Sequence, residues 1–237
     1  DTISIERIYS TIVQGFFIPE RGFSAQVIET ASKIVKATRL IWQLTKDRML
    51  PTPTKFHYVF NLRDLSRVTQ GLLQVTSKEV RTPDLLVSLW AHECFRVFPD
   101  KFTTDQDKQF FADAIVKIGT ECFSETYEHV LKEAPTRLWC SFMSDIDYSE
   151  YEGVDDADIP RKYELVPTFE ALNKRCVEFM ADHNAKPSTK KKLDLVLFDD
   201  AMAHLVRISR IISIPRGHAL LVGVGGSGKQ SLTRLAS

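Results

Sequence analysis

Apolar residues recur every three or four positions through most of the first 134 residues, the spacing of α-helices that each bury one face. The longest such helix is expected between Ser24 and Met49. Its apolar stripe consists of Val27, Ala31, Ile34, Ile41 and Leu44. Similar spacing predicts helices over residues 4–17 (with Ile5, Ile8, Ile12 and Val13), 62–72, 83–97 and 104–118. We therefore predict that residues 1–134 form a helical subdomain.

Capping signals mark where several of these helices begin. Asn61 can accept a hydrogen bond from the first-turn amides, and Asp64, three residues on, completes a capping box. Thr82 followed by Pro83 gives a second start signal, and Thr104 gives a third. Proline residues at 51 and 53 end the long helix, because proline lacks the amide donor.

The pattern changes after residue 134. Residues 137–143 are short and apolar enough for a strand, whereas residues 145–158 hold seven acids and no base and are predicted as a solvated connector. Helices are expected over residues 166–183 and 198–212. The second of these presents Ala201, Leu205, Ile208 and Ile212 inward. We predict that residues 135–237 begin a second domain.

A continuous apolar run, His218–Val222, is typical of a strand buried on both faces of a parallel sheet. The glycine-rich stretch that follows has the pattern Gly-x4-Gly-Lys of a phosphate loop, between that strand and a helix-prone end. Glycines allow backbone amides to converge on phosphate oxygens, and Lys229 adds a mobile positive charge. The residues predicted to bind a nucleotide are Gly223, Val224, Gly225, Gly226, Ser227, Gly228, Lys229, Gln230 and Ser231.

One position departs from the phosphate-loop pattern. Gln230 stands where serine or threonine normally offers a hydroxyl to Mg²⁺, and Ser231 comes one residue later, rotated by about 100° on a helix. The Gln230 carbonyl oxygen is a possible metal ligand on a longer arm. Nucleotide binding is expected to survive this change, whereas the change argues against efficient hydrolysis.

The same glycines leave a rival open, because Gly223, Gly225 and Gly228 also satisfy the dinucleotide-binding fingerprint. That alternative leaves Lys229 unexplained and needs an acidic residue about 20 positions further on. A phosphate-loop domain needs later strands and an acid for Mg²⁺, so we expect this chain, truncated after its first strand, not to be catalytically competent alone.

Composition narrows the possible partners. Lys and Arg number 31, as do Asp and Glu, so nothing indicates broad attraction to nucleic acid or to an anionic membrane. No apolar run reaches the roughly 18 to 20 residues that span a bilayer.

Four separated cysteines without a Cys-x-x-Cys pair predict buried, reduced thiols. The first residues have neither Met nor a secretory signal, so we expect a piece of a longer protein.

Three stretches together resemble axonemal dynein heavy chains: FHYVFNLRDLSRV at 56–68, HECFRVF at 92–98 and GHALLVGVGGSGKQSL at 217–232. The resemblance implies a mainly α fold, in which a helical AAA+ lid ends the third module of a motor ring and the start of an α/β P-loop domain opens the fourth. It further implies ATP or ADP with Mg²⁺, and a microtubule motor that powers ciliary or flagellar movement from the cytoskeleton of the axoneme. Implied partners are neighbouring AAA+ modules, microtubules, and dynein intermediate and light chains, with a coiled coil outside this segment.

The resemblance also implies roles for three residues. Arg63 matches the sensor arginine at the start of a lid helix, which reaches the nucleotide of its own module; a local ion pair with Asp64 is the alternative. Leu197 and Phe198 lie where AAA+ modules contact adenine, or else they only pack in the core.

Two other classes of protein remain open, namely a helical connector with a vestigial loop and a signal-transduction P-loop ATPase of the NACHT or STAND type.

Overall fold

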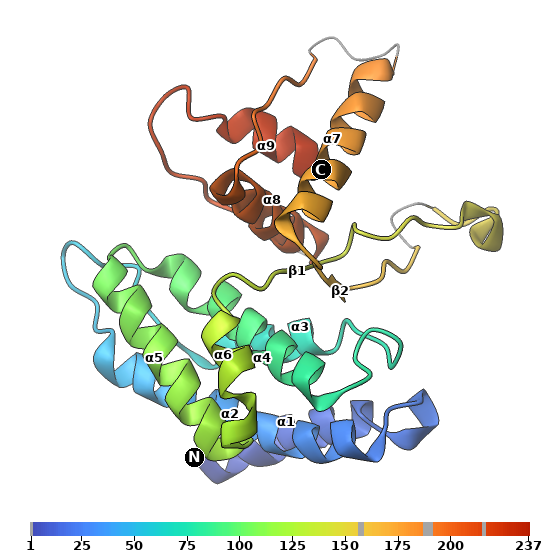
Figure 1. Ribbon diagram of the computed structural model, residues 1–237. Coiled ribbons are helices and arrows are strands. Elements are labelled where there is room, and N and C mark those ends of the chain that lie inside the picture. Colours follow the sequence, from blue (N-terminus) through green and yellow to red (C-terminus); the bar gives the residue numbers. More distant parts are fainter. Residues whose placement is uncertain (1, 156–158, 187–191, 215–216) are drawn as a thin grey trace. The chain divides into compact units, whose positions relative to one another are not determined.

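The computed structural model describes residues 2–155, 159–186, 192–214 and 217–237. The chain divides into two compact units, Asp1–Arg137 and Leu138–Ser237 (Figure 1). The division falls three residues after the predicted boundary at residue 134. The fold class is mainly α, as predicted.

The first unit is built from helices alone among its described residues. They are α1 (Thr2–Phe16), η1 (Pro19–Arg21), α2 (Ala25–Arg48), α3 (Leu62–Leu72), α4 (Pro83–Val97), η2 (Pro99–Lys101), α5 (Asp105–Cys122), η3 (Glu125–Tyr127) and α6 (Glu128–Glu133). The predicted caps are confirmed, because the Asn61, Thr82 and Thr104 side chains each accept a hydrogen bond from an amide of the helix that follows. Ser24 caps α2 in the same way. Local capping chemistry thus defines where these helices begin.

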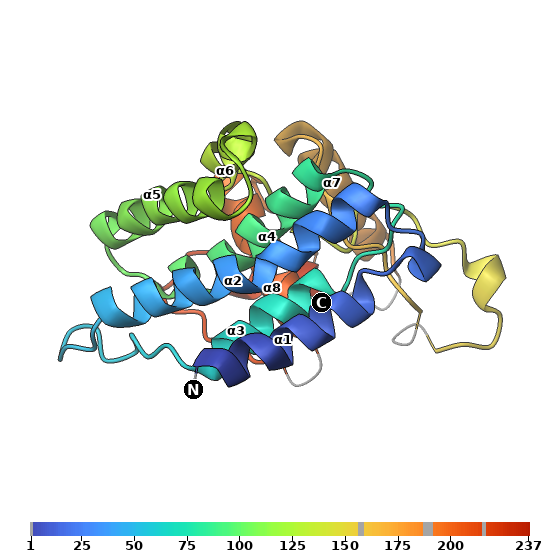
Figure 2. The same cartoon turned by 90° about the horizontal axis from the view of Figure 1, so that it is seen from below.

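Helix α4 forms the centre of this unit, and every residue from Leu86 to Val97 is buried. It contacts α2, α3 and α6, while α2 also contacts α1 and α5. Figure 2 shows α2 running between α1 and α5. The Trp90 indole donates a hydrogen bond to Thr38 Oγ1 at 2.9 Å, which satisfies the polar atom of a fully buried ring.

Two of the predicted apolar stripes are only partly covered. On α1, Val13 is buried but Ile8 and Ile12 are 58% and 43% exposed. Helix α1 packs mainly on α2, and Tyr9 also bonds to Leu62 and Ser66 of α3, so the burial of α1 is concentrated on the side that faces these two helices. Leu44 on α2 is likewise 37% exposed.

The second unit holds a short antiparallel pair and three helices among its described residues. Strand β1 (Trp139–Cys140) pairs with β2 (Glu164–Leu165), with Trp139 opposite Leu165. The helices are α7 (Phe169–Ala185), α8 (Asp199–Ser213) and α9 (Lys229–Ala236), and η4 (Tyr148–Tyr151) lies in the acidic connector. The connector is exposed over most of residues 145–155, as predicted. Its residues 156–158, and also residues 187–191 and 215–216, lie outside the described residues.

The core of this unit brings β1 together with α7 and α8. Its buried members are Leu138, Cys140, Val166, Leu172, Cys176, Met202, Leu205 and Val206. On α8, Ala201, Leu205 and Ile208 face inward as predicted, but Ile212 is 39% exposed. Ile212 lies in the last turn of α8, beyond the contact with α7 and β1.

The predicted buried strand at His218–Val222 is wrong for this structure. The segment belongs to no sheet, and Leu220 and Val222 are 91% and 87% exposed. A parallel strand exists only when neighbours pair with its backbone and helices cover its faces. In the described part of the chain the one sheet is the β1–β2 pair, which lies elsewhere in the sequence.

Candidate phosphate-binding loop

The loop ahead of α9 has the backbone geometry that its glycines allow. Gly226 and Gly228 have φ values of 78° and 74°, a left-handed region that costs residues with a β-carbon roughly 1 kcal/mol or more. Gly228 is also the N-cap of α9. A β-carbon at Gly225, Gly226 or Gly228 would meet no atom within 4 Å, so open space lies over the loop. The two positive φ angles therefore require glycine for conformation rather than for packing.

The amides of this loop are available as donors. Across the described residues, no amide of residues 223–231 donates a hydrogen bond to the protein. The last of these amides belong to the first turn of α9, where the helix carries partial positive charge. A run of unpaired amides that ends at a helix N-terminus can bind an anion.

Lys229 lies over the loop and is not turned away from it. Its ammonium donates to Gly223 O at 2.8 Å, to Val224 O at 2.6 Å and to Ser227 Oγ at 2.9 Å. All three acceptors belong to the loop itself. The positive charge is therefore held close to the loop, at a place where it would attract phosphate oxygens. An anion that binds here must replace these three oxygens as the acceptor of the hydrogen bonds of the Lys229 ammonium.

Gln230 and Ser231 follow on the first turn of α9. Gln230 is exposed, and with Leu221, Lys229 and Arg234 it lines an open hollow beside the loop. Ser231 is half-buried and lies on a different side of the helix, one step of about 100° away. The Ser231 hydroxyl therefore does not take the place that Gln230 occupies.

Helix α9 is attached to the core of its unit through one face. Leu232, Leu235 and Ala236 pack against the cluster formed by β1, α7 and α8. This packing fixes the direction of α9, and the loop at its N-terminus follows. The exposed face carries Gln230, Thr233 and Arg234.

Arg63 lies in the other unit, at the second position of α3. The Asn61 side chain accepts from Arg63 N at 2.9 Å, and Asp64 Oδ2 accepts from Asn61 N at 2.8 Å, which completes the predicted capping box. The Arg63 side chain is exposed, and within the described chain its guanidinium has no hydrogen bond or ion pair.

The alternative of a local ion pair between Arg63 and Asp64 is wrong. Asp64 Oδ1 accepts instead from Lys101 Nζ at 2.7 Å, and the Asp64 side chain is only 3% exposed. Neighbouring residues on a helix point about 100° apart, so Asp64 faces the core while Arg63 faces outward.

Leu197 and Phe198 occupy different environments. Leu197 is partly buried against the core cluster, and its carbonyl accepts from Asn173 Nδ2 at 3.0 Å. Phe198 is 59% exposed at the N-cap of α8. Packing therefore accounts for Leu197, whereas no packing in the described unit accounts for the exposed Phe198 ring.

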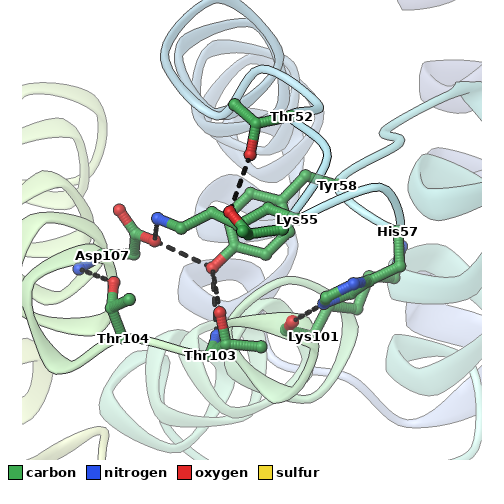
Figure 3. A network of polar contacts seen from close by, with 9 residues as sticks. Thr52, Lys55, His57, Tyr58, Lys101, Thr103, Thr104 and Asp107 are labelled. Carbon is green, nitrogen blue, oxygen red and sulfur yellow. Dashed lines mark hydrogen bonds and ion pairs between the residues drawn. The ribbon is translucent and has the colours of Figure 1, made fainter.

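A polar network ahead of α3 has no counterpart in the sequence prediction. Lys55 Nζ and Tyr58 Oη donate to Asp107 Oδ2 at 2.5 and 2.8 Å, and Tyr58 Oη accepts from Thr103 N at 3.0 Å (Figure 3). These partners are 45 to 52 residues apart in the sequence. Only the folded chain brings them together, and no local signal points to them.

The cysteines are free thiols, as predicted, with Cys94, Cys140 and Cys176 buried and Cys122 half-buried. Burial raises the pKa of Cys140 to about 12 and that of Cys176 to about 11. Such thiols stay protonated at neutral pH and are poor nucleophiles. No helix in the described ranges is long and apolar enough to cross a membrane.

Two protein families match parts of the chain. Residues 34–134 match the AAA+ lid domain, and residues 193–237 match the P-loop containing dynein motor region D4. Similar proteins include Dynein axonemal heavy chain 5 of Rattus norvegicus, 45% identical over 236 residues, and Dynein axonemal heavy chain 8 of Mus musculus, 44% identical over 237 residues. The ciliary Dynein beta chain of Tripneustes gratilla is 44% identical over 234 residues.

Each of these alignments covers 99% of this chain but only 5 to 7% of the relative. The match therefore concerns one segment of a much longer protein. The two matched domains fall in the two units of the structure, the lid in the helical unit and the P-loop region in the unit that ends with α9. The chain belongs to the axonemal dynein heavy chain family, as a segment that runs from an AAA+ lid domain into motor region D4.

Proposed function

We propose that residues 223–231 bind the phosphates of ATP or ADP with Mg²⁺, as part of the AAA+ ring of a microtubule motor. In this proposal the heavy chain works in the axoneme of a cilium or flagellum. The axoneme is part of the cytoskeleton, so the protein is cytoplasmic. Its partners are the neighbouring AAA+ modules, microtubules, and dynein intermediate and light chains. The names of the relatives, axonemal and ciliary, support this setting.

The observation that carries the proposal is the loop itself. Within the described ranges, the loop amides that lead into the first turn of α9 are unpaired, and the Lys229 ammonium donates to loop oxygens. The partial charge of the helix and the full charge of the lysine act on the same side. Nucleotide phosphates provide the negative charge and the oxygens that this arrangement lacks.

Two further contacts belong to the proposal. Arg63 contacts the nucleotide of the third module, whose phosphate loop is a different one. Its guanidinium is exposed and has no partner in the described part of the chain, which supports this role. Phe198 and Leu197 contact adenine in the fourth module, for which the exposed Phe198 ring is the better supported of the two. Gln230 replaces the usual Mg²⁺ hydroxyl, so the fourth site regulates the motor rather than drives it.

The test is Lys229→Ala in the complete heavy chain, read with a photoreactive ATP analogue and peptide mapping. We expect labelling of the peptide that contains residues 217–236 to fall about 10-fold or more, the loss of a charge-assisted contact to phosphate. Lys174→Ala is the matched control, because it removes the same charge from an exposed position on α7. Equal labelling of both variants would show that the loop is only a turn.

A structural connector with a vestigial loop is the second candidate function. The observation that favours it is that Lys229 already has three acceptors within the loop. Under this alternative the wild-type peptide takes up no label above the level of Lys229→Ala. The same experiment therefore separates the two candidates.

A further inference from the structure

The point where α3 begins determines where Arg63 is presented. Arg63 is the second residue of the helix, and each residue turns the side-chain direction by about 100°. A helix that started one residue earlier or later, or at another angle, would carry the guanidinium away from its target. Whatever holds the entry of α3 therefore controls the direction of Arg63.

Lys101, in η2, contacts the entry of α3 at three points. Its carbonyl accepts from His57 Nε2 at 2.9 Å, as Figure 3 shows. Its ammonium lies 5.0 Å from the centre of the Phe60 ring and donates to Asp64 Oδ1 at 2.7 Å. One residue thus holds positions 57, 60 and 64, which span the segment on both sides of the cap.

The ion pair with Asp64 is well placed to fix this geometry. The Asp64 side chain is 3% exposed and that of Lys101 is 26% exposed, so solvent screens the pair only partly. The other oxygen of Asp64 closes the capping box on Asn61 N. Arg67 also faces Asp64, but at 3.9 Å and with half of its side chain exposed. Lys101 is therefore the closer and the less exposed of the two cations that contact Asp64.

The second network, of Lys55, Tyr58 and Asp107, holds the middle of the same segment to α5. Its contacts stop at Tyr58, whereas those of Lys101 continue to Phe60 and Asp64. Lys101 is therefore a polar link between η2 and the first turn of α3, beside the direct packing of α3 on α4.

We propose that Lys101 is a positioning residue for Arg63, which it aims at nucleotide phosphate by holding Asp64, Phe60 and His57 around the start of α3. This inference rests on the proposed function, in which Arg63 contacts a nucleotide. Lys101 itself touches no nucleotide; it acts through the direction of the helix.

The experiment is a double-mutant cycle in the complete heavy chain, with a fluorescent ATP analogue as the probe. The heavy chain binds the analogue at more than one site, and Arg63→Ala identifies the site that Arg63 contacts. We expect this variant to lower the affinity of that site about 10-fold to 100-fold. Lys101→Met keeps the apolar stem and removes the charge, and should weaken the same component about 3-fold to 10-fold. In the Arg63→Ala background, Lys101→Met should change the affinity by less than about 2-fold.

Lys117→Met on α5 is the matched control, because Lys117 is exposed and has no ion pair in the described structure. Lys101→Arg keeps the charge and should restore most of the affinity lost in Lys101→Met. A purely structural role of Lys101 would lower affinity equally with and without Arg63, and that additivity would overturn the inference.

The two proposals fail in distinguishable ways. No effect of Arg63→Ala would overturn the nucleotide role of Arg63, and the positioning role with it. A clear effect of Arg63→Ala with none of Lys101→Met would overturn the positioning role alone. If Lys101→Met does not fold, Asp64→Asn replaces it, because asparagine keeps the shape and a capping oxygen but loses the ion pair, and the same cycle applies.

Discussion

Side chains next to one another in the sequence have opposite environments at several points of this chain. On the first turn of α3, Arg63 faces outward without a partner among the described residues, while Asp64 is buried in an ion pair with Lys101. On α8, Phe198 at the cap is exposed, while Leu197 before it packs inward. Residue type alone does not decide which of two neighbours meets the core, because the rotation of the helix does.

Gly71 shows how closely the core of the first unit is packed. A β-carbon at this position on α3 would lie 1.8 Å from Glu93 Oε2, and Glu93 is fully buried on α4. We predict that Gly71→Ala destabilises the chain by about 1 to 3 kcal/mol, because the buried carboxylate must move. Urea unfolding of the two proteins measures this difference.

Gly15→Ala provides the comparison, because nothing lies within 4 Å of a β-carbon at that helical position on α1. Relief of backbone entropy should stabilise this variant by up to about 1 kcal/mol. If both variants had the same stability, the close approach of α3 and α4 at Gly71 would be contradicted.

At the scale of elements, the segment before α3 depends on ionised groups of α5. Burial raises the pKa of Asp107, but hydrogen bonds from Lys55, Thr104 and Tyr58 lower it more, so the net pKa lies below its usual value. The hydrogen bond with Asp107 raises the pKa of Lys55. Both shifts indicate that the charged pair is favoured in the folded state.

The pH dependence follows from these directions. The contribution of Asp107 is complete above its unfolded pKa of about 3.9 and is lost as the pH falls through the lower folded value. That of Lys55 is complete below about pH 10.4 and is lost as the pH rises through the higher folded value. We predict that Asp107→Asn lowers stability by about 1 kcal/mol at pH 7 and flattens the acid limb below about pH 4.

Asp113→Asn is the control on the same helix, because Asp113 is exposed and bonds only to Gln109 among the described residues. Thermal unfolding from pH 3 to pH 7 compares the variants. An acid limb of Asp107→Asn as steep as that of the wild type would contradict the assignment.

The extent to which the elements follow from the sequence depends on the range of the interactions that define them. The starts of α2, α3, α4 and α5 were predictable, because a cap and its amide lie within three residues of each other. The strand expected at His218–Val222 was not, because strands form by pairing with distant segments. The glycine loop was predictable as a motif, but the contact of Lys101 with Asp64 joins positions 37 residues apart.

At the scale of the whole molecule, the chain joins two domains with separate roles in the proposed motor. In the proposal, the lid carries Arg63 for one nucleotide and the loop ahead of α9 binds another, and these two regions lie in different units of the chain. The single departure from the phosphate-loop pattern, Gln230, is proposed to limit ATP hydrolysis at the second of these sites. A carboxamide can bind Mg²⁺, but its longer arm places the metal differently from a hydroxyl.

We predict that Gln230→Thr in the complete heavy chain leaves nucleotide binding at this loop within about 3-fold and raises hydrolysis there by about 10-fold or more. The measurement is the ratio of ADP to ATP retained on the photolabelled peptide of residues 217–236. Thr233→Ser on the same helix is the control, since it alters a hydroxyl side chain one turn further on. Brisk hydrolysis in the wild type that is lost on changing Gln230 would refute a regulatory role.

The extended segment before the glycine loop, His218–Val222, affects how the chain associates with other molecules. Among the described residues, the backbone amides and carbonyls of His218–Val222 pair with no other segment, and Leu220 and Val222 are almost wholly in solvent. Such an edge is a template for β-pairing, and a second molecule supplies a complementary strand as readily as the rest of the domain does. The stretch that precedes the glycine loop is thus also a candidate for self-association, which pairing with other strands would prevent.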